Sequence, residues 1–576
     1  MMKRILAVCL GFILVGGFAG AQVHAAVFDV KSFGAVGDGK TLDTAAINKA
    51  IDAAHVAGGG TVQFPAGTYL SFSIHLQSNI ALYLDHGATI LAADSPTNGA
   101  AGYDPPETNA WDRYQDFGHT HWHNSLIWGE GLENISILGP GLIHGKGLSR
   151  GTGSGTGRGG RGGAGTNAAP AGARGDFRGG GLGGPTATNE AARGGLRGGG
   201  FGGFGGPTNQ TYPNPRDTLM SGIGNKSISL KNCHNVVLRD FSILHGGHFG
   251  ILATGVDNLT IDNLKIDTNR DGIDIDCCRN VRVSNCSVNS PWDDAIVPKS
   301  SYALGYLRPC ENITIANCYV TGGYEEGTLL DGTFKRFSPE ARVSHTGRIK
   351  CGTESNGGFK NLTVANCVFD YCGGLALEIV DGGTMEDVSI SNISMRDIVN
   401  SPIFIRLGNR ARGPDNPPVG VIRRVNISNI VTSNSSWRLG SIISGIPGHP
   451  IEDMRISNVH FVYQGGGTKE NAALDPPERE TGYPEPSMFG TMPAYGFYVR
   501  HVKGLEMDHI EVSYVKDEMR PVMVLNDVDG ADFDHVKARR TPEVPFFVLR
   551  KVSDFAVRNC TGLPDTRREA VEQEPF

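Results

Sequence analysis

The chain has 576 residues, a formal net charge of −7 and a hydrophobic fraction of 39%. A mildly acidic chain disfavours a nucleic-acid partner, which usually requires a basic face, although local lysine and arginine side chains can still bind an anionic substrate. The length fits several ordinary domains, but it also fits one long all-β repeat, so length alone does not decide the architecture.

The N-terminus has the pattern of a secretory signal peptide. Two basic residues precede an apolar run from Ile5 to Val15, and cleavage is expected after Ala21 or Ala25. The apolar run is too short to span a membrane, and no later segment offers ~18 uninterrupted apolar residues. We therefore assign residues 1–25 to a signal peptide and expect a secreted or periplasmic protein without a membrane span.

Residues 26–150 are predicted to form an N-terminal cap and the first coils of a repeat. Asp43 or Thr44 can begin a helix, glycines end it, and its apolar stripe consists of Ile47, Ala50 and Ile51. A stack of coils must cover its exposed first coil to remain soluble. We expect this helix to be that cover.

Residues 151–206 differ from the rest of the chain, because they are rich in glycine and arginine and nearly devoid of large aliphatic side chains. Such a composition does not offset the entropy lost on ordering, so a disordered insert is predicted. Arginine-glycine runs also occur in RNA-binding proteins. That alternative is disfavoured in an exported chain.

Residues 207–576 are predicted to be a β-helix body. Short runs rich in valine, isoleucine and threonine recur, and the closest copies are 22 residues apart at Asn263 and Asn285. No long amphipathic helix separates them, which disfavours a doubly wound sheet. Asparagine suits the left-handed conformation at a bend and can bond to the next copy. The recurring asparagines are Asn232, Asn263, Asn285, Asn317, Asn366, Asn392, Asn429 and Asn458.

A cysteine follows several of these asparagines. One cysteine per coil gives a line of side chains rather than a tetrahedral cage, so we predict a buried stack and not a metal site. The cysteines concerned are Cys233, Cys286, Cys318, Cys367 and Cys560.

Charged residues recur on strands that would line one exposed sheet, with neighbouring coils ~4.8 Å apart. Acids on adjacent coils can then approach closely enough to form the paired carboxylates of glycoside hydrolysis, in which one protonates the leaving oxygen and another acts on water or carbon. An acidic turn or a calcium site is the alternative for the first coil. The residues, coil by coil, are Asp271, Asp274 and Asp276; Asp293, Asp294 and Lys299; His345, Arg348 and Lys350; Glu378; and Arg406.

The string NRDGIDID from Asn269, followed by WDDAIVPKS, resembles the Asn-x-Asp and Asp-Asp motifs of glycoside hydrolase family 28, the polygalacturonase family of the pectin-lyase-like β-helices. The N-terminal strings FGAVGDGKTLDTAAINKAI and GGGTVQFPAGTYL resemble the same family. The resemblance implies an all-β fold, a single right-handed parallel β-helix with an N-terminal capping helix. It also implies inverting hydrolysis of galacturonosyl linkages without a cofactor or a metal.

Carried over by position, the resemblance makes Asp293 the general acid and lets Asp271 and Asp294 activate water. Asn269 and Lys299 match positions that support this cluster.

The substrate-binding motifs depart from the family pattern. The family has Gly-His-Gly on the next strand and Arg-x-Lys one coil later, whereas this chain reads SHTGRIKCGTE and then LALEI. His345 is therefore near the expected place, and Arg348 and Lys350 lie one coil early. Two apart on a strand, they point to the same side and can clamp a uronate carboxylate. Salt bridges to Glu378 or Glu354 are the alternative.

On the following coils, Glu378 stands where a cation is expected, and Arg406 is a candidate to replace that cation from one coil further on.

The run FGHTHWHNSLIWGE is rich in histidine and tryptophan, which stack on sugars and bond to their hydroxyls. A zinc site is the alternative, but no fourth ligand is evident. We interpret His119, His121 and His123 as part of a cleft wall or of the packing.

The predicted function is hydrolysis of galacturonosyl linkages in a pectic polysaccharide or oligosaccharide by a monomer, with exo action or a rhamnogalacturonan substrate as finer expectations. One alternative is a polysaccharide lyase, which would use Lys or Arg as the base and hold calcium with Asp274 and Asp276. Another is a carbohydrate-binding β-helix without activity.

Overall fold

The computed structural model describes residues 26–96, 101–116, 118–149, 222–268 and 270–576. The predicted signal peptide, the predicted insert at 151–206 and Asn269 lie outside these residues. No helix in the described ranges is long and apolar enough to cross a membrane.

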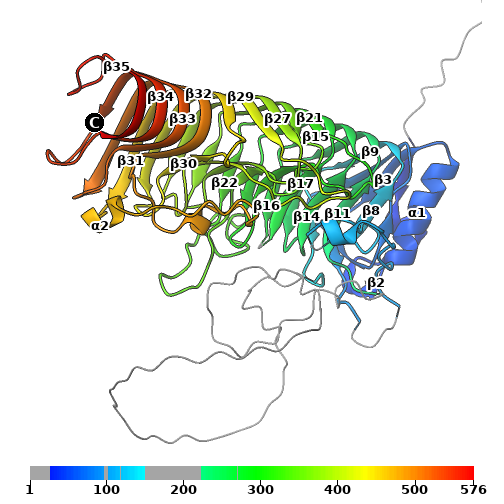
Figure 1. Ribbon diagram of the computed structural model, residues 1–576. Helices are drawn as coiled ribbons and strands as arrows, with labels where there is room; N and C mark the ends of the chain where they lie inside the picture. Colours follow the sequence, from blue (N-terminus) through cyan, green and yellow to red (C-terminus); the bar gives the residue numbers. More distant parts are fainter. Residues whose placement is uncertain (1–25, 97–100, 117, 150–221, 269) are drawn as a thin grey trace, which may run out of the picture.

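The described residues form a right-handed parallel β-helix, which confirms the predicted fold class (Figure 1). Each coil contributes strands to three sheets. The first sheet consists of β5 (Ile74–His75), β8 (Ile127–Glu130), β11 (Lys226–Lys231), β14 (Phe249–Thr254), β17 (Asp271–Asp276), β20 (Ile296–Lys299), β23 (Ile349–Cys351), β26 (Leu375–Ile379), β28 (Ile403–Leu407) and β30 (Ser441–Ser444).

The other two sheets complete each coil. The second contains β1 (Val27–Asp29), β3 (Gly60–Phe64), β6 (Ile80–Leu84), β9 (Glu133–Leu138), β12 (His234–Arg239), β15 (Asp257–Asp262), β18 (Arg279–Ser284), β21 (Cys310–Ala316) and β24 (Phe359–Ala365). The third contains β2 (Asp38–Leu42), β4 (Gly67–Ser71), β7 (Ala88–Ala92), β10 (Leu142–His144), β13 (Ser242–Leu244), β16 (Lys265–Asp267), β19 (Ser287–Asn289), β22 (Tyr319–Thr321) and β25 (Val368–Asp370).

Towards the C-terminus, long strands bend from one sheet into the next. They are β27 (Thr384–Arg396), β29 (Val421–Ser435), β31 (Ile451–Gly465), β32 (Phe497–Lys516), β33 (Met523–Ala538) and β34 (Phe547–Arg558). The first residues of β32 extend the first sheet by pairing with β30.

The predicted asparagine bends are present. All eight of the asparagines have positive φ, from 51° at Asn232 to 57° at Asn285, Asn366 and Asn392. Their amides bond from coil to coil, as between Asn392 and Asn366 and between Asn429 and Asn392, both at 3.0 Å. This ladder satisfies polar groups at each bend and fixes the register between coils.

The ten cysteines of the described residues are free and buried. All of them except Cys277 belong to the apolar interior of the coils, together with valine, isoleucine and leucine side chains. The prediction of a buried thiol stack is confirmed.

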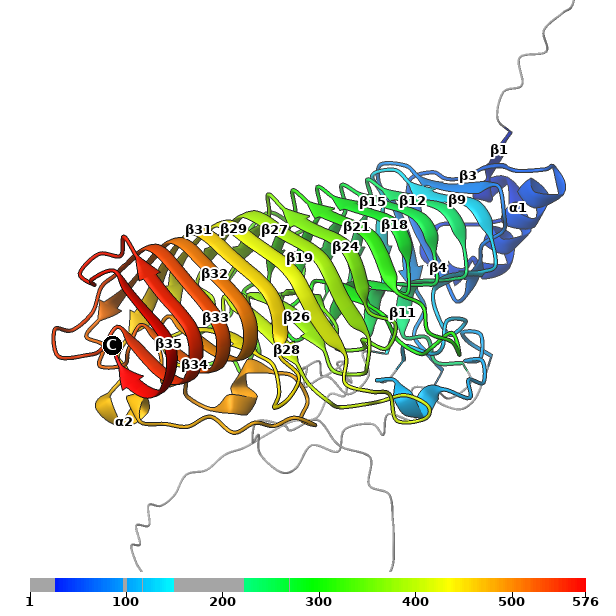
Figure 2. The same ribbon diagram turned by 45° about the horizontal axis from the view of Figure 1, so that its top comes forward.

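Both ends of the β-helix are covered (Figure 2). Helix α1 (Thr44–Val56) buries Ile47, Ala50 and Ile51 against the first coil, as predicted. Asp43 precedes the helix, but its carboxylate accepts hydrogen bonds from the amides of Val36 and Gly37 instead of capping α1. At the other end, the antiparallel strand β35 (Thr566–Pro575) covers β34 with a charged edge, which discourages pairing with another chain.

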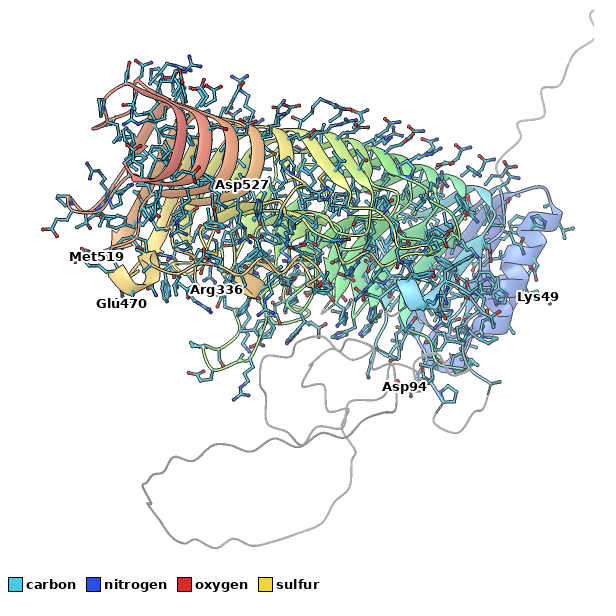
Figure 3. The ribbon with its side chains drawn as sticks, viewed as in Figure 1. Lys49, Asp94, Arg336, Glu470, Met519 and Asp527 are labelled. Atoms are coloured by element: carbon cyan, nitrogen blue, oxygen red, sulfur yellow. The ribbon has the colours of Figure 1, made fainter. Side chains whose placement is uncertain are left out.

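Two segments cross the outer face of the first sheet. The N-terminal wall (residues 101–116 and 118–126, with the 3₁₀ turn η2, Asp112–Tyr114) places Trp122 on β14, where its indole N–H donates to Thr254 at 2.9 Å. The strap (residues 466–495) contains α2 (Lys469–Ala472) and η4 (Pro486–Phe489). Its Phe489 packs on Phe404 of β28. In Figure 3, Lys49 of α1 and Glu470 of α2 mark opposite ends of the solenoid.

Candidate active site

Three aspartates meet between the wall and the strap. Asp271 begins β17, while Asp293 and Asp294 lie in the turn before β20. Carboxylate oxygens of the three lie within 4.8 Å of one another. The amide of Asp294 donates to Asp271 at 3.3 Å and to Asp293 at 3.1 Å, which holds the cluster together.

The surroundings shift the pKa values of two of these carboxyl groups in opposite directions. Burial alone would raise the pKa of Asp294, but the charges of Arg348 and Lys350 outweigh it and hold the pKa well below its usual value. Their nitrogens lie 2.6 Å and 3.2 Å from the Asp294 oxygens. Burial and the nearby charges of Asp274 and Asp293 raise the pKa of Asp271 well above its usual value. The cluster therefore brings together one carboxyl group whose surroundings favour the ionised form and one whose surroundings favour the protonated form.

Asp293 is the member of the cluster that solvent reaches. Its side chain is 25% exposed, whereas Asp271 and Asp294 are buried. The guanidinium of Arg270 lies 2.7 Å from its carboxylate.

Arg348 and Lys350 point to the same side of their strand, as predicted, and each contacts two carboxyl groups of the chain. Arg348 bridges Asp294 and Glu485 of the strap, with contacts of 2.7 Å and 3.0 Å to the two Glu485 oxygens. Lys350 lies 3.2 Å from Asp294 and 3.8 Å from Glu378. Arg348 and Lys350 therefore form salt bridges within the chain, which was the alternative to a clamp for a uronate carboxylate. Glu378 is one of the two partners of Lys350.

Glu354, the other predicted partner, pairs with Lys299 instead. The Lys299 ammonium lies 3.4 Å from Glu354 and 3.6 Å from Asp274. His119 of the wall approaches Asp274 to 3.3 Å. A buried ammonium beside Asp274 is a poor neighbour for a calcium ion, and Asp276 accepts hydrogen bonds from the amide and hydroxyl of Ser301.

Glu378 is fully buried, and neither of its carboxyl oxygens has a hydrogen-bond partner. Burial raises its pKa to about 7, with a smaller contribution from the charge of Glu485 and against the opposing charge of Lys350. Between its unfolded pKa of 4.5 and about 7, the folded chain keeps a proton that the unfolded chain has released. Because the folded state binds more protons in this interval, stability falls as the pH rises through it.

We therefore expect the Glu378→Gln variant to lack this part of the pH dependence. Relative to wild type, its free energy of unfolding should rise by about 1.4 kcal/mol for each pH unit between about 5 and 7. Urea unfolding of both proteins across this range measures the difference. An identical pH dependence would show that Glu378 is ionised in the folded protein at pH 5.

Two predicted site residues are not brought to the carboxylates. His345 stacks on Tyr371, with ring centroids 4.3 Å apart, and its Nδ1 contacts the carbonyl of Gly322 at 2.9 Å. Burial lowers its pKa. Within the described residues, no hydrogen bond or ion pair joins its ring to the aspartates.

Arg406 is the second predicted site residue that does not reach the carboxylates. Its guanidinium donates to the carbonyls of Glu478 and Arg479 in the strap and to the hydroxyl of Ser444. It holds the strap on the first sheet and does not replace the missing cation. The third candidate, Asn269, lies outside the described residues.

Sequence reasoning missed the strap residues Tyr483 and Glu485. Tyr483 accepts a hydrogen bond from Thr353 at 3.0 Å, and its ring lies 5.7 Å from both the Lys350 ammonium and the Arg410 guanidinium. The strap follows the catalytic coils by more than a hundred residues and carries no repeat pattern. Only the tyrosine and acid in the string GYPEP offer a signal.

The histidine-rich run forms part of the wall. His119, His121 and His123 contact three different carboxylates, those of Asp274, Asp112 and Glu130. Because they do not converge, they do not make the zinc site that was the alternative.

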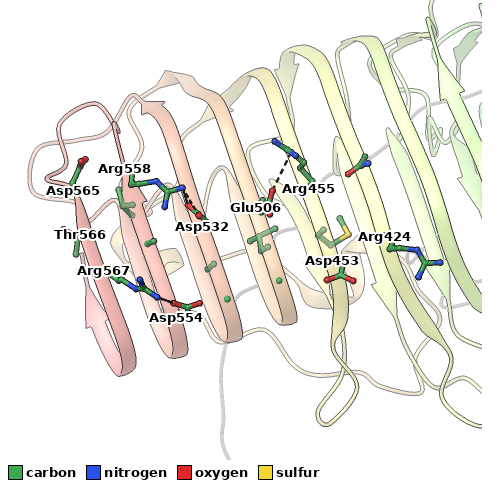
Figure 4. Close-up of a pocket in the computed structure, with 18 residues that line it drawn as sticks. Arg424, Asp453, Arg455, Glu506, Asp532, Asp554, Arg558, Asp565, Thr566 and Arg567 are labelled. Atoms are coloured by element: carbon green, nitrogen blue, oxygen red, sulfur yellow. Dashed lines mark hydrogen bonds and ion pairs between the residues drawn. The ribbon is translucent and has the colours of Figure 1, made fainter.

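A groove of about 960 Å³ on the second sheet lies away from this cluster (Figure 4). Most of its charges are paired with each other, as Arg558 with Asp532, Arg567 with Asp554 and Arg455 with Glu506. Paired side chains at an open surface offer little to a ligand, so we assign no site there.

Parts of the sequence are similar to known proteins. The family described as rhamnogalacturonase A/epimerase, pectate lyase-like, matches residues 27–136. A probable polygalacturonase of Vitis vinifera is 23% identical over 446 residues, covering 74% of this chain and 72% of the relative. The mannuronan C5-epimerase AlgE3 of Azotobacter vinelandii is 71% identical over 42 residues, so the match spans 7% of this chain and only 2% of that relative.

Among solved structures, the family 28 exopolygalacturonase of Yersinia enterocolitica aligns with a TM-score of 0.55 and 18% identity, covering 94% of this chain and 79% of that one. This likeness concerns the fold. The polygalacturonase relative adds a likeness in sequence, and the two aspartate motifs lie on adjacent coils. The chain is therefore similar to the polygalacturonases and shares the β-helix fold of a family 28 exopolygalacturonase.

Proposed function

We propose that this protein hydrolyses galacturonosyl linkages of a pectic glycan with Asp271, Asp293 and Asp294. The observation that carries the proposal is the meeting of three carboxyl groups within 4.8 Å, in surroundings that lower the pKa of Asp294 and raise the pKa of Asp271. Acid–base hydrolysis needs both forms at the same place and pH.

Asp294 is suited to activate water, because Arg348 and Lys350 keep it ionised. Asp293 faces the solvent side and is placed to protonate the leaving oxygen. The raised pKa of Asp271 does not fit the water-activating role that the family resemblance predicts, because a protonated carboxyl accepts no proton. We assign it instead the relay of a proton after each turnover from Asp294, which gains one from the attacking water, to Asp293, which has given one to the leaving oxygen.

Inversion at the anomeric carbon stays a prediction. Inverting glycosidases usually separate their two carboxyl groups by about 6.5–9.5 Å, and the oxygens here are closer. The anomeric form of the first product, followed by proton NMR during hydrolysis, decides between inversion and retention.

Exo action is supported by the wall and the strap, which cross the first sheet on either side of the carboxylates. A site bounded on both sides by such segments admits a chain end more readily than the middle of a polymer. The export predicted from residues 1–25 belongs to the same proposal, since a polymeric substrate must be met outside the cytoplasm.

The lyase alternative needs a lysine or arginine that can lose a proton. Burial lowers the pKa of Lys299 and Lys350, but their carboxylate neighbours outweigh it and raise both pKa values well above the usual value. Such cations are poor bases. Hydrolysis is therefore the better-supported reaction.

Product chemistry tests the proposal. We expect the purified protein, incubated with pectic oligosaccharides of defined structure, to release new reducing ends without ultraviolet absorbance. Unsaturated sugar ends that absorb ultraviolet light would show that the protein is a lyase and not a hydrolase. Binding without any new reducing ends would favour the carbohydrate-binding alternative.

A further inference from the structure

The strap contributes a carboxylate to the active site that no catalytic motif contains. Glu485 contacts Arg348 through both of its oxygens, at 2.7 Å and 3.0 Å, while Arg348 contacts Asp294 on its other side. The Arg348 side chain is only 3% exposed, whereas that of Glu485 is 33% exposed. A sugar beside the cluster therefore meets the carboxylate before it meets the cation.

Three further cations on the strap side and beneath the cluster are enclosed in the same way, whereas Arg270, in the part of the chain that the structure describes, contacts only Asp293. Within the described residues, Lys350 lies between Asp294 and Glu378, and Lys299 lies between Asp274 and Glu354. Arg410 contacts Asp381 and lies 3.8 Å from Glu354. Each of these three cations thus already has two acidic neighbours from the chain itself.

A uronate and a neutral sugar are expected to bind beside these groups with different affinities. The carboxylate of a uronate would approach Glu485, which is acidic and partly exposed, and like charges in a partly desolvated site repel each other strongly. A neutral sugar would instead donate a hydroxyl to the Glu485 carboxylate, which accepts hydrogen bonds well.

We propose that the sugar subsite on the strap side of the carboxylate cluster, bordered by Glu485, Arg348 and Asp293, takes a neutral sugar rather than a uronate. Glu485 is then a specificity-determining residue. The inference rests on the proposed function and narrows it to a heteroglycan in which a neutral sugar adjoins the linkage that is cleaved.

Galactose and galacturonate make a matched pair of probes, because they differ only in the group on carbon 6. We expect wild type to bind galactose at least about tenfold more tightly than galacturonate, as measured by calorimetry or ligand-observed NMR. Glu485→Gln removes the repelling charge and exposes Arg348 to a ligand, so the ratio should fall several-fold. Glu480→Gln, an exposed strap residue outside the site, is the control and should keep the wild-type ratio.

Three outcomes would overturn the inference. They are equal or tighter binding of galacturonate by wild type, binding of neither sugar, and an unchanged ratio in Glu485→Gln. The first would mean that Glu485 occupies the place of a substrate carboxylate and is displaced by it.

Turnover separates this inference from the proposed function. If oligomers of galacturonate alone are hydrolysed faster than oligomers that alternate with a neutral sugar, the inference fails and the hydrolase stands. If neither kind of oligomer is hydrolysed, galactose can still bind preferentially and Glu485→Gln can still reduce that preference. The neutral-sugar subsite would then be supported, and the proposed hydrolase activity would be rejected.

Discussion

Replacing Asp293 with asparagine is expected to lower kcat on pectic oligosaccharides by about 10³-fold, because the leaving oxygen would lose its proton donor. KM should change little, since the substitution preserves shape and the side chain lies at the rim of the buried cluster, 25% exposed. Steady-state kinetics with a natural glycosidic leaving group gives both constants. A kcat within tenfold of wild type would remove Asp293 from the role of acid.

The leaving group distinguishes the acid from the base. An aryl glycoside departs without protonation, so the loss in Asp293→Asn should shrink strongly on such a substrate. The loss in Asp294→Asn should persist, because attack by water still lacks its base. Asp475→Asn, a 78% exposed carboxylate of the strap, serves as the control and should match wild type on both substrates.

A reversed pattern would exchange the two roles. Asp294→Asn would then be relieved by the aryl group, and the low pKa of Asp294 would reflect only its ion pairs with Arg348 and Lys350. Equal losses in both variants on both substrates would indicate that the cluster acts as one unit.

The fold could be predicted because its determinants are local and repeated. Each bend needs a residue that tolerates positive φ, and the sequence supplies Asn263, Asn285 and Asn317 at successive copies. Helix α1 followed from the spacing of Ile47, Ala50 and Ile51. The role of Asp43 did not follow, because its partners in the loop at residues 36–37 depend on how the chain turns back.

The site could be predicted only in part, for the same physical reason. Asp271 and Asp293 sit on adjacent coils, so the repeat brings them together. The partners of Arg348 and Arg406 lie in the strap, and the contact between Arg348 and Glu485 joins residues 137 apart in the sequence. Such contacts depend on the path of an irregular segment, which no periodic pattern specifies.

Arg520→Met is expected to destabilise the folded protein by about 3–5 kcal/mol, the usual result of removing one partner of a buried ion pair. Arg520 and Glu518 are fully buried and contact each other at 2.7 Å. The pair also fastens both ends of the strap. The carboxylate of Glu518 accepts from the amide of Gly467, and Arg520 donates to the carbonyls of Met492 and Ala494.

Urea unfolding of wild type and variant measures the destabilisation, and limited proteolysis reports whether the strap is released. Arg455→Met is the matched control, since its pair with Glu506 is 3.7 Å apart and more than half exposed, and it should change stability by less than about 0.5 kcal/mol. Arg455 touches no part of the strap in the described residues.

The double variant Glu518→Gln with Arg520→Met separates two causes of the loss. If the uncompensated charge of Glu518 dominates, the neutral glutamine should restore most of the stability. If the lost bonds to Met492 and Ala494 dominate, the double variant should be as unstable as the single one. In that case, the strap would also loosen over Arg348, and the sugar preference assigned to Glu485 should weaken along with the stability.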